Sequence, residues 1–146
     1  MEKNEEIVRN MYEAVSKGNL NELDQWVDQN MTEHTPDPTM QVEGKGLEYV
    51  KNFFTQIRNA FPDFKMTVNE VFTKGDKVGV YYSTKGTQKG EMNGIPPTNK
   101  STEVTGFDLL LLKDGKVTEH WGLYDSMKMM MDLELITEKE LHGHNH

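Results

Sequence analysis

The spacing of hydrophobic residues changes near the middle of this chain, and the change restricts the fold more than any other feature. Up to residue 61, apolar side chains recur every three or four residues, as they do on one face of a helix. From residue 64 to residue 124 they alternate with polar residues, as in a strand with one buried face. Helices followed by strands predict an α+β fold.

Three helices are expected before the change. The first covers residues 7–15 and ends at Gly18, because glycine readily adopts the left-handed conformation that closes a helix. A short second helix covers residues 20–27, and a loop follows. The third and longest covers residues 47–61, and Pro62 ends it because proline disfavours helical geometry in the residue before it.

Two hairpins of one antiparallel sheet are expected after the change. Four segments alternate in hydrophobicity, over residues 64–68, 78–80, 102–112 and 117–124. The first two flank the turn Lys74-Gly75-Asp76, and the last two flank Asp114-Gly115. A final helix, rich in methionine, is expected over residues 127–135.

The length of 146 residues fits a single domain with one core. We expect this domain to cover residues 1–141 and to leave residues 142–146 as a flexible tail. The tail contains His142, His144 and His146, whose alternate spacing would suit a weakly held metal ion. A flexible terminus is the simpler interpretation, because the sequence offers no further ligand beside them.

Composition excludes several classes of protein. The chain has no cysteine, which removes disulfides, thiolate nucleophiles and cysteine-based zinc sites. Its formal net charge is −8 and its basic residues are scattered, so nucleic acid is not an expected partner. No apolar run approaches the roughly 20 residues that cross a bilayer, and the first ten residues do not look like a secretory signal. We therefore expect a soluble, cytoplasmic protein without a membrane partner.

Five stretches, spread over nearly the whole chain, match the pattern of a known family in order and spacing. They are residues 16–20 with Leu23, residues 33–38, residues 60–64, residues 86–87 with 90–98, and residues 114–117 with 119–121. Together they resemble the SnoaL-like polyketide and ester cyclases of the NTF2-like superfamily. The most specific pieces are Gly-Ile-Pro-Pro-Thr at 94–98 and Glu-His-Trp at 119–121.

The resemblance implies a fold and a chemistry. The fold would be a conical half-barrel, in which a curved antiparallel sheet wraps N-terminal helices around a cavity, and two copies would pair through the sheet as a homodimer. The family's cyclases close a ring by intramolecular aldol condensation without metal or organic cofactor. An acidic side chain takes a proton from the carbon next to a carbonyl, which requires a carboxyl group whose pKa an apolar cavity brings near neutrality.

The hairpin around Asp114-Gly115 carries the main candidates for catalysis, Asp108 and His120. A two-residue loop would pair Leu109 with His120, whereas a three-residue loop with a bulge at Gly115 would pair Asp108 with His120. We favour the second, because it gathers the polar pair on the face that would line a cavity. That face carries Gly106, Asp108, Leu110, His120 and Gly122, and the opposite face carries Phe107, Leu109, Leu111, Trp121 and Leu123.

Each of these two residues also has a simpler interpretation. An aspartate in so apolar a strand is costly to bury without a partner, so Asp108 is expected to act as a base or to orient His120. The alternative is a solvated strand residue. His120 would serve as a general acid or base, or donate to a substrate oxygen, unless it is a structural histidine bonded to nearby backbone.

Five further residues are candidates for the pocket: His34, Trp121, Gly122, Tyr124 and Asp125. The resemblance places His34 at the cavity mouth, although a surface loop position is as well supported. Asp125 would suit the N-terminus of the last helix, where an aspartate accepts hydrogen bonds from free backbone N–H groups. Trp121 and Tyr124 also suit a contact in the core or in a dimer.

Two positions depart from the family pattern. The cyclases carry their acid/base aspartate immediately after the His-Trp pair, where this chain has Gly122. Gln88 stands where many relatives carry histidine. If the chain is an enzyme, Asp108 must supply the carboxylate or the reaction must differ.

Three functions therefore remain open. The first is a cofactor-independent cyclase that transfers protons on a hydrophobic, carbonyl-bearing small molecule through Asp108 and His120. The second is a module that binds such a molecule without turning it over, consistent with Gly122. The third is a hydrolase or isomerase of the same fold, because one fold hosts many reactions.

Overall fold

The computed structural model describes residues 2–142, and its helices lie where the apolar spacing predicts them. Helix α1 covers Lys3–Lys17 and ends at Gly18, whose φ of 82° is the expected left-handed closure. A 3₁₀ helix, η1, covers Leu20–Gln25. Helix α2 covers Leu47–Ala60 and ends before Pro62. None of the helices in residues 2–142 is long and apolar enough to cross a membrane.

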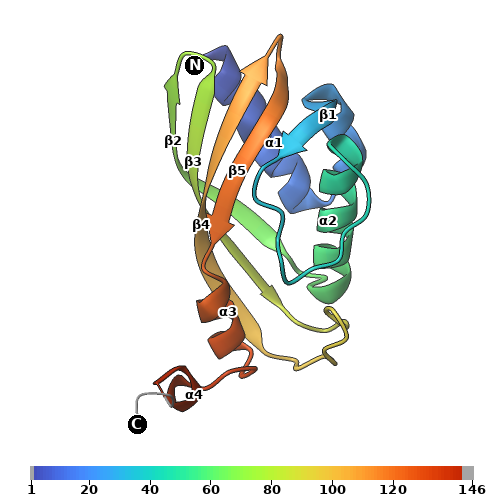
Figure 1. Ribbon diagram of the computed structural model, residues 1–146, viewed down its shortest axis with the longest axis vertical. Helices are drawn as coiled ribbons and strands as arrows, with labels where there is room; N and C mark the ends of the chain where they lie inside the picture. Colours follow the sequence, from blue (N-terminus) through green and yellow to red (C-terminus); the bar gives the residue numbers. More distant parts are fainter. Residues whose placement is uncertain (1, 143–146) are drawn as a thin grey trace.

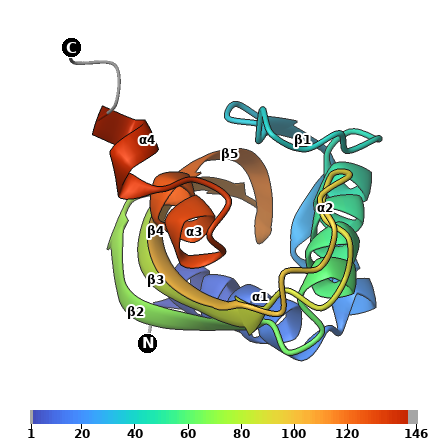
Figure 2. The same cartoon turned by 90° about the horizontal axis from the view of Figure 1, so that it is seen from below.

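Five strands form one sheet with the order β1-β5-β4-β3-β2. They are β1 (Val27–Glu33), β2 (Lys65–Lys74), β3 (Lys77–Thr87), β4 (Ser101–Lys113) and β5 (Lys116–Tyr124). Strands β2 to β5 form the two predicted antiparallel hairpins, whereas β1 pairs in parallel with β5. The sheet curves around α1 and α2 without closing, so the predicted α+β half-barrel is confirmed (Figures 1 and 2).

The core lies between the inner face of the sheet and the apolar face of α1. Val8, Met11 and Tyr12 of α1 pack with Val80 of β3 and Leu110 of β4, and all five are buried. Each fully buried side chain of this kind contributes about 1.5–3 kcal/mol of apolar burial. This packing fixes which face of β4 and β5 points inward.

The hairpin between β4 and β5 differs from the predicted one in its pairing but not in its faces. Its turn has two residues, Asp114 and Gly115, both with positive φ as in a type I′ turn, so the three-residue loop was wrong. A register shift then follows at Thr118, because Leu112 pairs with Val117 and Leu111 pairs with Glu119. The shift restores the alternation, so His120 pairs with Leu110, and Gly122 pairs with Asp108. Asp108, His120 and Gly122 therefore share a face, as predicted.

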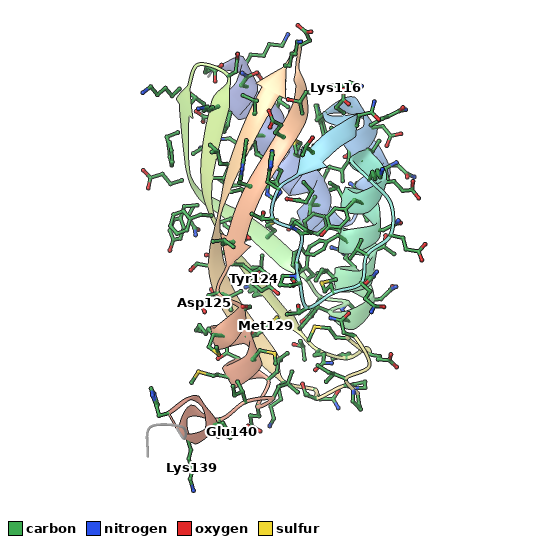
Figure 3. All side chains as sticks on the ribbon, viewed as in Figure 1. Lys116, Tyr124, Asp125, Met129, Lys139 and Glu140 are labelled. Atoms are coloured by element: carbon green, nitrogen blue, oxygen red, sulfur yellow. The ribbon has the colours of Figure 1, made fainter. Side chains whose placement is uncertain are left out.

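The chain ends in two short helices, α3 (Ser126–Asp132) and α4 (Glu138–His142). Tyr124 and Asp125 lie where β5 passes into α3 (Figure 3). The side chain of Asp125 accepts a hydrogen bond from the backbone N–H of Lys128 at 3.0 Å, which makes it the N-cap of α3. Of the tail predicted over residues 142–146, only His142 lies within the described residues, where it is the last residue of α4.

Candidate functional site

Three side chains from neighbouring strands meet on the inner face of the sheet. Asp108 comes from β4, His120 from β5 and Glu33 from the end of β1. Glu33 is the register partner of His120 across the parallel pair, which brings the two side chains together although 87 residues separate them. The curved sheet thus assembles a site that no local motif contains.

The imidazole of His120 lies between two carboxylates. Its Nδ1 atom is 2.6 and 2.8 Å from the carboxylate oxygens of Glu33, and its Nε2 atom is 2.8 Å from Oδ1 of Asp108. Burial opposes the charged imidazolium, but hydrogen bonds to Asp108 and Glu33 outweigh it and raise the pKa of His120 to about 10. At neutral pH His120 is therefore an imidazolium that donates through both nitrogens, and its chemical effect is to hold Asp108 in place.

Tyr12 of α1 holds the second oxygen of Asp108. Its hydroxyl donates to Oδ2 across 96 positions of sequence. Burial and the neighbouring Asp108 carboxylate raise the pKa of Tyr12 well above its usual value, so the phenol keeps its proton. Asp108 is thus fixed by one charged and one neutral donor.

The loop after β1 holds the other carboxylate. Glu33 accepts hydrogen bonds from the backbone N–H and the hydroxyl of Thr35, at 3.1 and 3.3 Å. The Thr35 hydroxyl in turn accepts from the N–H of Gly122 at 2.7 Å. The side chains of Asp108, Glu33 and His120 remain 11%, 13% and 23% exposed, so the group is mostly buried but keeps some accessible surface.

Gly122 makes room for the Asp108 carboxylate. A Cβ atom at position 122 would collide with Oδ1 of Asp108 and would lie 2.8 Å from Nε2 of His120. Gly122 and Asp108 are also direct partners across the hairpin. The carboxylate from β4 therefore occupies the space into which a side chain at position 122 would project.

The remaining sequence candidates lie outside this group, and Trp121 faces the outer side of the sheet because it alternates with His120. His34 bonds to Glu119 at 2.9 Å and its ring stacks on that of Trp121, with centroids 4.2 Å apart, while Glu33 takes the position beside His120. The Tyr124 hydroxyl donates to Asp37 at 2.9 Å. Asp125 is exposed as the N-cap of α3.

Sequence reasoning missed Glu33 and Tyr12. Glu33 precedes the histidine that the resemblance points to, and only the alternation along β1 shows which of the two faces inward. Tyr12 lies on the apolar face of α1, where the sequence pattern predicts a core residue and no part in a site. A signal for Tyr12 was its hydroxyl, because a buried phenol usually finds a hydrogen-bond partner.

Gln88, which departs from the pattern that the resemblance implies, has a structural role. It is fully buried, and its Nε2 atom lies 3.2–3.4 Å from the carbonyl oxygens of Gly90, Ile95 and Pro96. Its Oε1 atom accepts from the N–H and the hydroxyl of Thr98. The side chain thus fixes the loop that contains the Gly-Ile-Pro-Pro-Thr motif.

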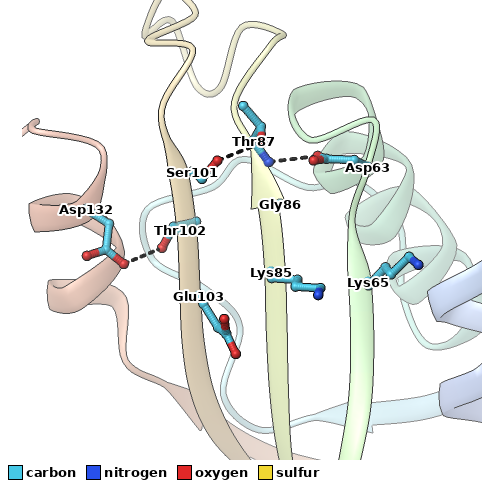
Figure 4. Close-up of a pocket in the computed structure, with 9 residues that line it drawn as sticks. All are labelled: Asp63, Lys65, Lys85, Gly86, Thr87, Ser101, Thr102, Glu103 and Asp132. Carbon is cyan, nitrogen blue, oxygen red and sulfur yellow. Dashed lines mark hydrogen bonds between the residues drawn. The ribbon is translucent and has the colours of Figure 1, made fainter.

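A separate polar hollow of about 540 Å³ lies on the sheet beside α3 (Figure 4). Its lining includes Lys65, Lys85 and Glu103, and its carboxylates at Asp63 and Asp132 bond to Thr87 and Thr102. Along β4 it lies about 17 Å or more from Asp108, at roughly 3.4 Å per residue. It is therefore distinct from the group around His120. Within residues 2–142, no cluster of three or more His, Asp or Glu side chains is arranged to hold a metal ion.

Comparison with known families decides the relationship of this chain. The model of the family described as SnoaL-like polyketide cyclase matches residues 5–133. The chain belongs to this family. A comparison with curated proteins found no match.

Solved structures agree with this SnoaL-like fold. IdmH of Streptomyces antibioticus, described as a candidate polyketide cyclase, is 25% identical with a TM-score of 0.79, over 91% of this chain and 99% of that one. A candidate polyketide cyclase of Bacillus cereus is 26% identical with a TM-score of 0.76, over 92% and 83%. AclR of Streptomyces galilaeus, described as a candidate hydroxylase, shares the fold at 21% identity and a TM-score of 0.75, over 92% and 97%.

Proposed function

We propose that this SnoaL-like protein is a cyclase-type enzyme that transfers protons on a hydrophobic, carbonyl-bearing small molecule, with Asp108 as the acid/base group. The observation that supports it most is the position of the Asp108 carboxylate over Gly122. The family resemblance places the acid/base aspartate at position 122, and here Asp108 puts its oxygens where that side chain would begin. The carboxylate reaches the same region from the neighbouring strand.

The proposed reaction uses Asp108 twice. One carboxylate oxygen takes the proton from the carbon next to a substrate carbonyl, and the C–H electron pair forms a C=C bond while the carbonyl π pair moves to its oxygen. The resulting enolate carbon then bonds to a second carbonyl carbon of the same molecule, and the second carbonyl oxygen takes the proton back from Asp108. His120 touches neither carbonyl, because both its N–H groups are occupied, and it serves to position the carboxylate.

A hydrophobic substrate is supported by the surroundings of the inner face. Leu47, Val50, Phe54 and Ile57 of α2 pack against the core yet remain partly exposed. Such side chains gain from covering by an apolar ligand, at about 25 cal/mol per Å² of surface removed from water. The ligand would lie between α2 and the sheet, within reach of Asp108.

Substitution of Asp108 by asparagine tests the proposal. The amide keeps the shape of the side chain but cannot take the proton, so ring closure of a diketone or polyketone substrate should fall by 100-fold or more, about the contribution of a general base. Asp132→Asn is the matched control, because Asp132 lies in the separate polar hollow, where it bonds to Lys128 and Thr102. Unchanged turnover in Asp108→Asn would rule out the assigned base.

One observation favours a binding module as the second candidate. Both oxygens of Asp108 already accept hydrogen bonds, from His120 and Tyr12, as they would in a purely structural carboxylate. A binding module would hold the substrate equally well in wild type and Asp108→Asn without turning it over. A hydrolase or isomerase would instead keep the dependence on Asp108 but act on water or on another substrate carbon.

We also propose that the protein is a homodimer that pairs through the outer face of the sheet. On that face Phe72, Phe107 and Leu123 are 60%, 60% and 76% exposed, and the ring of Tyr81 stacks on that of Phe107. Strand alternation puts these side chains opposite the inner face. Exposed apolar patches of this kind mark interaction surfaces. Light scattering at micromolar concentration should give twice the chain mass in wild type and one chain mass in Leu123→Glu; a monomeric wild type would exclude the dimer.

A further inference from the structure

Tyr82 of β3 places its hydroxyl on the inner face beside the Asp108 carboxylate. Tyr82 pairs across the sheet with Gly106 of β4, and Gly106 and Asp108 lie on the same face because two positions separate them. A Cβ atom at position 106 would collide with the hydroxyl oxygen of Tyr82. The phenol of Tyr82 therefore lies over Gly106, the neighbour of Asp108 on the inner face of β4. Its ring centroid is 6.0 Å from that of Tyr12.

The hydroxyl of Tyr82 differs from the other phenols of the inner face in having no partner. The Tyr12 hydroxyl donates to Asp108 and the Tyr124 hydroxyl to Asp37. Among residues 2–142, Tyr82 makes no side-chain hydrogen bond, and yet no fully buried side-chain nitrogen or oxygen lacks one. The Tyr82 hydroxyl oxygen is therefore not completely buried, although the residue as a whole is only 7% exposed.

The charge state of this phenol suits a donor. Burial, then the nearby Asp108 carboxylate and the Tyr124 phenol, raise the pKa of Tyr82 well above its usual value. The phenol keeps its proton throughout the physiological range. A protonated phenol with a free hydroxyl donates one hydrogen bond, and an oxyanion is the strongest acceptor it can meet.

We propose that Tyr82 is a second catalytic residue, whose hydroxyl donates a hydrogen bond to the enolate oxygen that forms when Asp108 removes the proton. This inference rests on the proposed function and names the part of the substrate that each group meets: Asp108 the α-carbon proton, Tyr82 the carbonyl oxygen. No proton moves from Tyr82, because the negative charge stays on the enolate oxygen until the second carbonyl is attacked. Preorganised donors aimed at developing charge contribute strongly to such steps. The proposed role also requires Gly106, because only a residue without a side chain leaves room for the Tyr82 hydroxyl.

Tyr82→Phe tests the proposal without the natural substrate. The probe is 4-nitrophenolate, whose planar, delocalised oxyanion imitates an enolate, and its neutral match is nitrobenzene. A hydrogen bond to a charged group contributes about 1.5–3 kcal/mol, so Tyr82→Phe should bind 4-nitrophenolate roughly 10- to 100-fold more weakly and nitrobenzene equally well. Tyr81→Phe, on the outer face, is the matched control and should bind both probes as wild type does.

The stability of the variants gives an independent check. Because the Tyr82 hydroxyl has no protein partner in the described chain, Tyr82→Phe should unfold at the wild-type urea concentration, whereas Tyr12→Phe should unfold earlier. Wild type that does not bind 4-nitrophenolate, or a Tyr82→Phe variant that loses both probes equally or neither, overturns the inference.

The same titration separates this inference from the proposed function. Asp108→Asn removes a negative charge beside the probe and should bind 4-nitrophenolate more tightly than wild type while losing turnover. If Asp108→Asn keeps turnover but binds 4-nitrophenolate more tightly, the assignment of Asp108 as the base is overturned and the role of Tyr82 stands. If Asp108→Asn loses turnover as expected but Tyr82→Phe binds 4-nitrophenolate as tightly as wild type does, the role of Tyr82 is overturned and that of Asp108 stands.

Discussion

His120 joins the site because each of its ring nitrogens meets a carboxylate from a different strand. A neutral imidazole has one N–H and one acceptor nitrogen, so it would donate to only one of the two. The imidazolium donates to both and offsets one of two negative charges. Glu33, His120 and Asp108 thus bring two acidic side chains and one basic side chain together, and Asp108 is the acidic group that we propose takes the proton from a substrate carbon.

Substitution of Gly122 by alanine should disturb Asp108 first. The added methyl group would collide with Oδ1 of Asp108 and crowd His120, both of which are held by further hydrogen bonds. Overpacking of this kind costs about 1–3 kcal/mol. Urea unfolding measures the loss, with Gly79→Ala as control, because the nearest atoms that a Cβ there would meet belong to the ring of Phe72, which is exposed and can move aside. Equal stability of the two variants would show that the Asp108 carboxylate is free to move.

Glu33 should set the charge of His120 and therefore act as a positioning residue. In Glu33→Gln the Nδ1 atom keeps a hydrogen-bonding partner but loses a negative charge, so the pKa of His120 should fall by about 1–3 units. NMR titration of the imidazole measures the shift. Glu119→Gln is the control, because Glu119 bonds to His34 instead. An unchanged His120 titration in Glu33→Gln would leave Asp108 as the sole cause of the raised pKa.

At the scale of elements, the alternation of polar and apolar residues predicted which side chains share a face of the sheet, but not which residues pair across the strands. The inner face of β4 and β5 was predicted correctly because alternation depends only on parity, and the bulge at Thr118 restores parity after a two-residue turn. The pairing itself was not predictable, because a bulge depends on local backbone geometry that Thr118 does not announce. Strand β1 was assigned in part to a helix, because only Val27 and Met31 of its seven residues are buried.

The Gly-Ile-Pro-Pro-Thr segment, the most specific sequence match, has a structural role in the described chain. The Gly-Ile-Pro-Pro-Thr segment lies in a loop whose carbonyl and N–H groups bond to the buried amide of Gln88. The departure of position 88 from the pattern that the resemblance implies was visible in the sequence. The structural role of Gln88 could not be predicted from the sequence, because it depends on which backbone groups of the loop face position 88.

The N-cap of α3 allows a test at this scale. Asp125→Ala removes the acceptor for the Lys128 N–H and should lower the stability of the protein by about 1 kcal/mol, whereas Asp125→Asn keeps an equally good cap and should cost little. Urea unfolding distinguishes the two. If Asp125→Ala is as stable as Asp125→Asn, the capping bond contributes nothing, and the exposed carboxylate is left without a structural role.

At the scale of the whole molecule, the site exists only because the sheet curves. The contacts of Tyr12 and Glu33 with the hairpin span 96 and 87 positions of sequence. Asp108 and His120 were predictable as neighbours, because their strands are joined by a short turn. Tyr12 and Glu33 were not, because their approach depends on how far the sheet wraps around α1 and on a parallel strand added at its edge (Figure 2).

The raised pKa of His120 predicts how the stability of the molecule depends on pH. The unfolded chain releases this proton near pH 6.5 and the folded protein near pH 10, so between these values the folded state holds one proton more. The stabilisation is complete below about pH 6.5 and is lost as pH rises toward 10, by up to about 1.4 kcal/mol per pH unit. Urea unfolding of wild type and His120→Gln from pH 6 to pH 10 measures it, because the difference between the two removes the contribution of all other groups. Wild type should lose its advantage over the variant steadily across this range. Parallel stability curves would mean that His120 carries no extra proton in the folded protein.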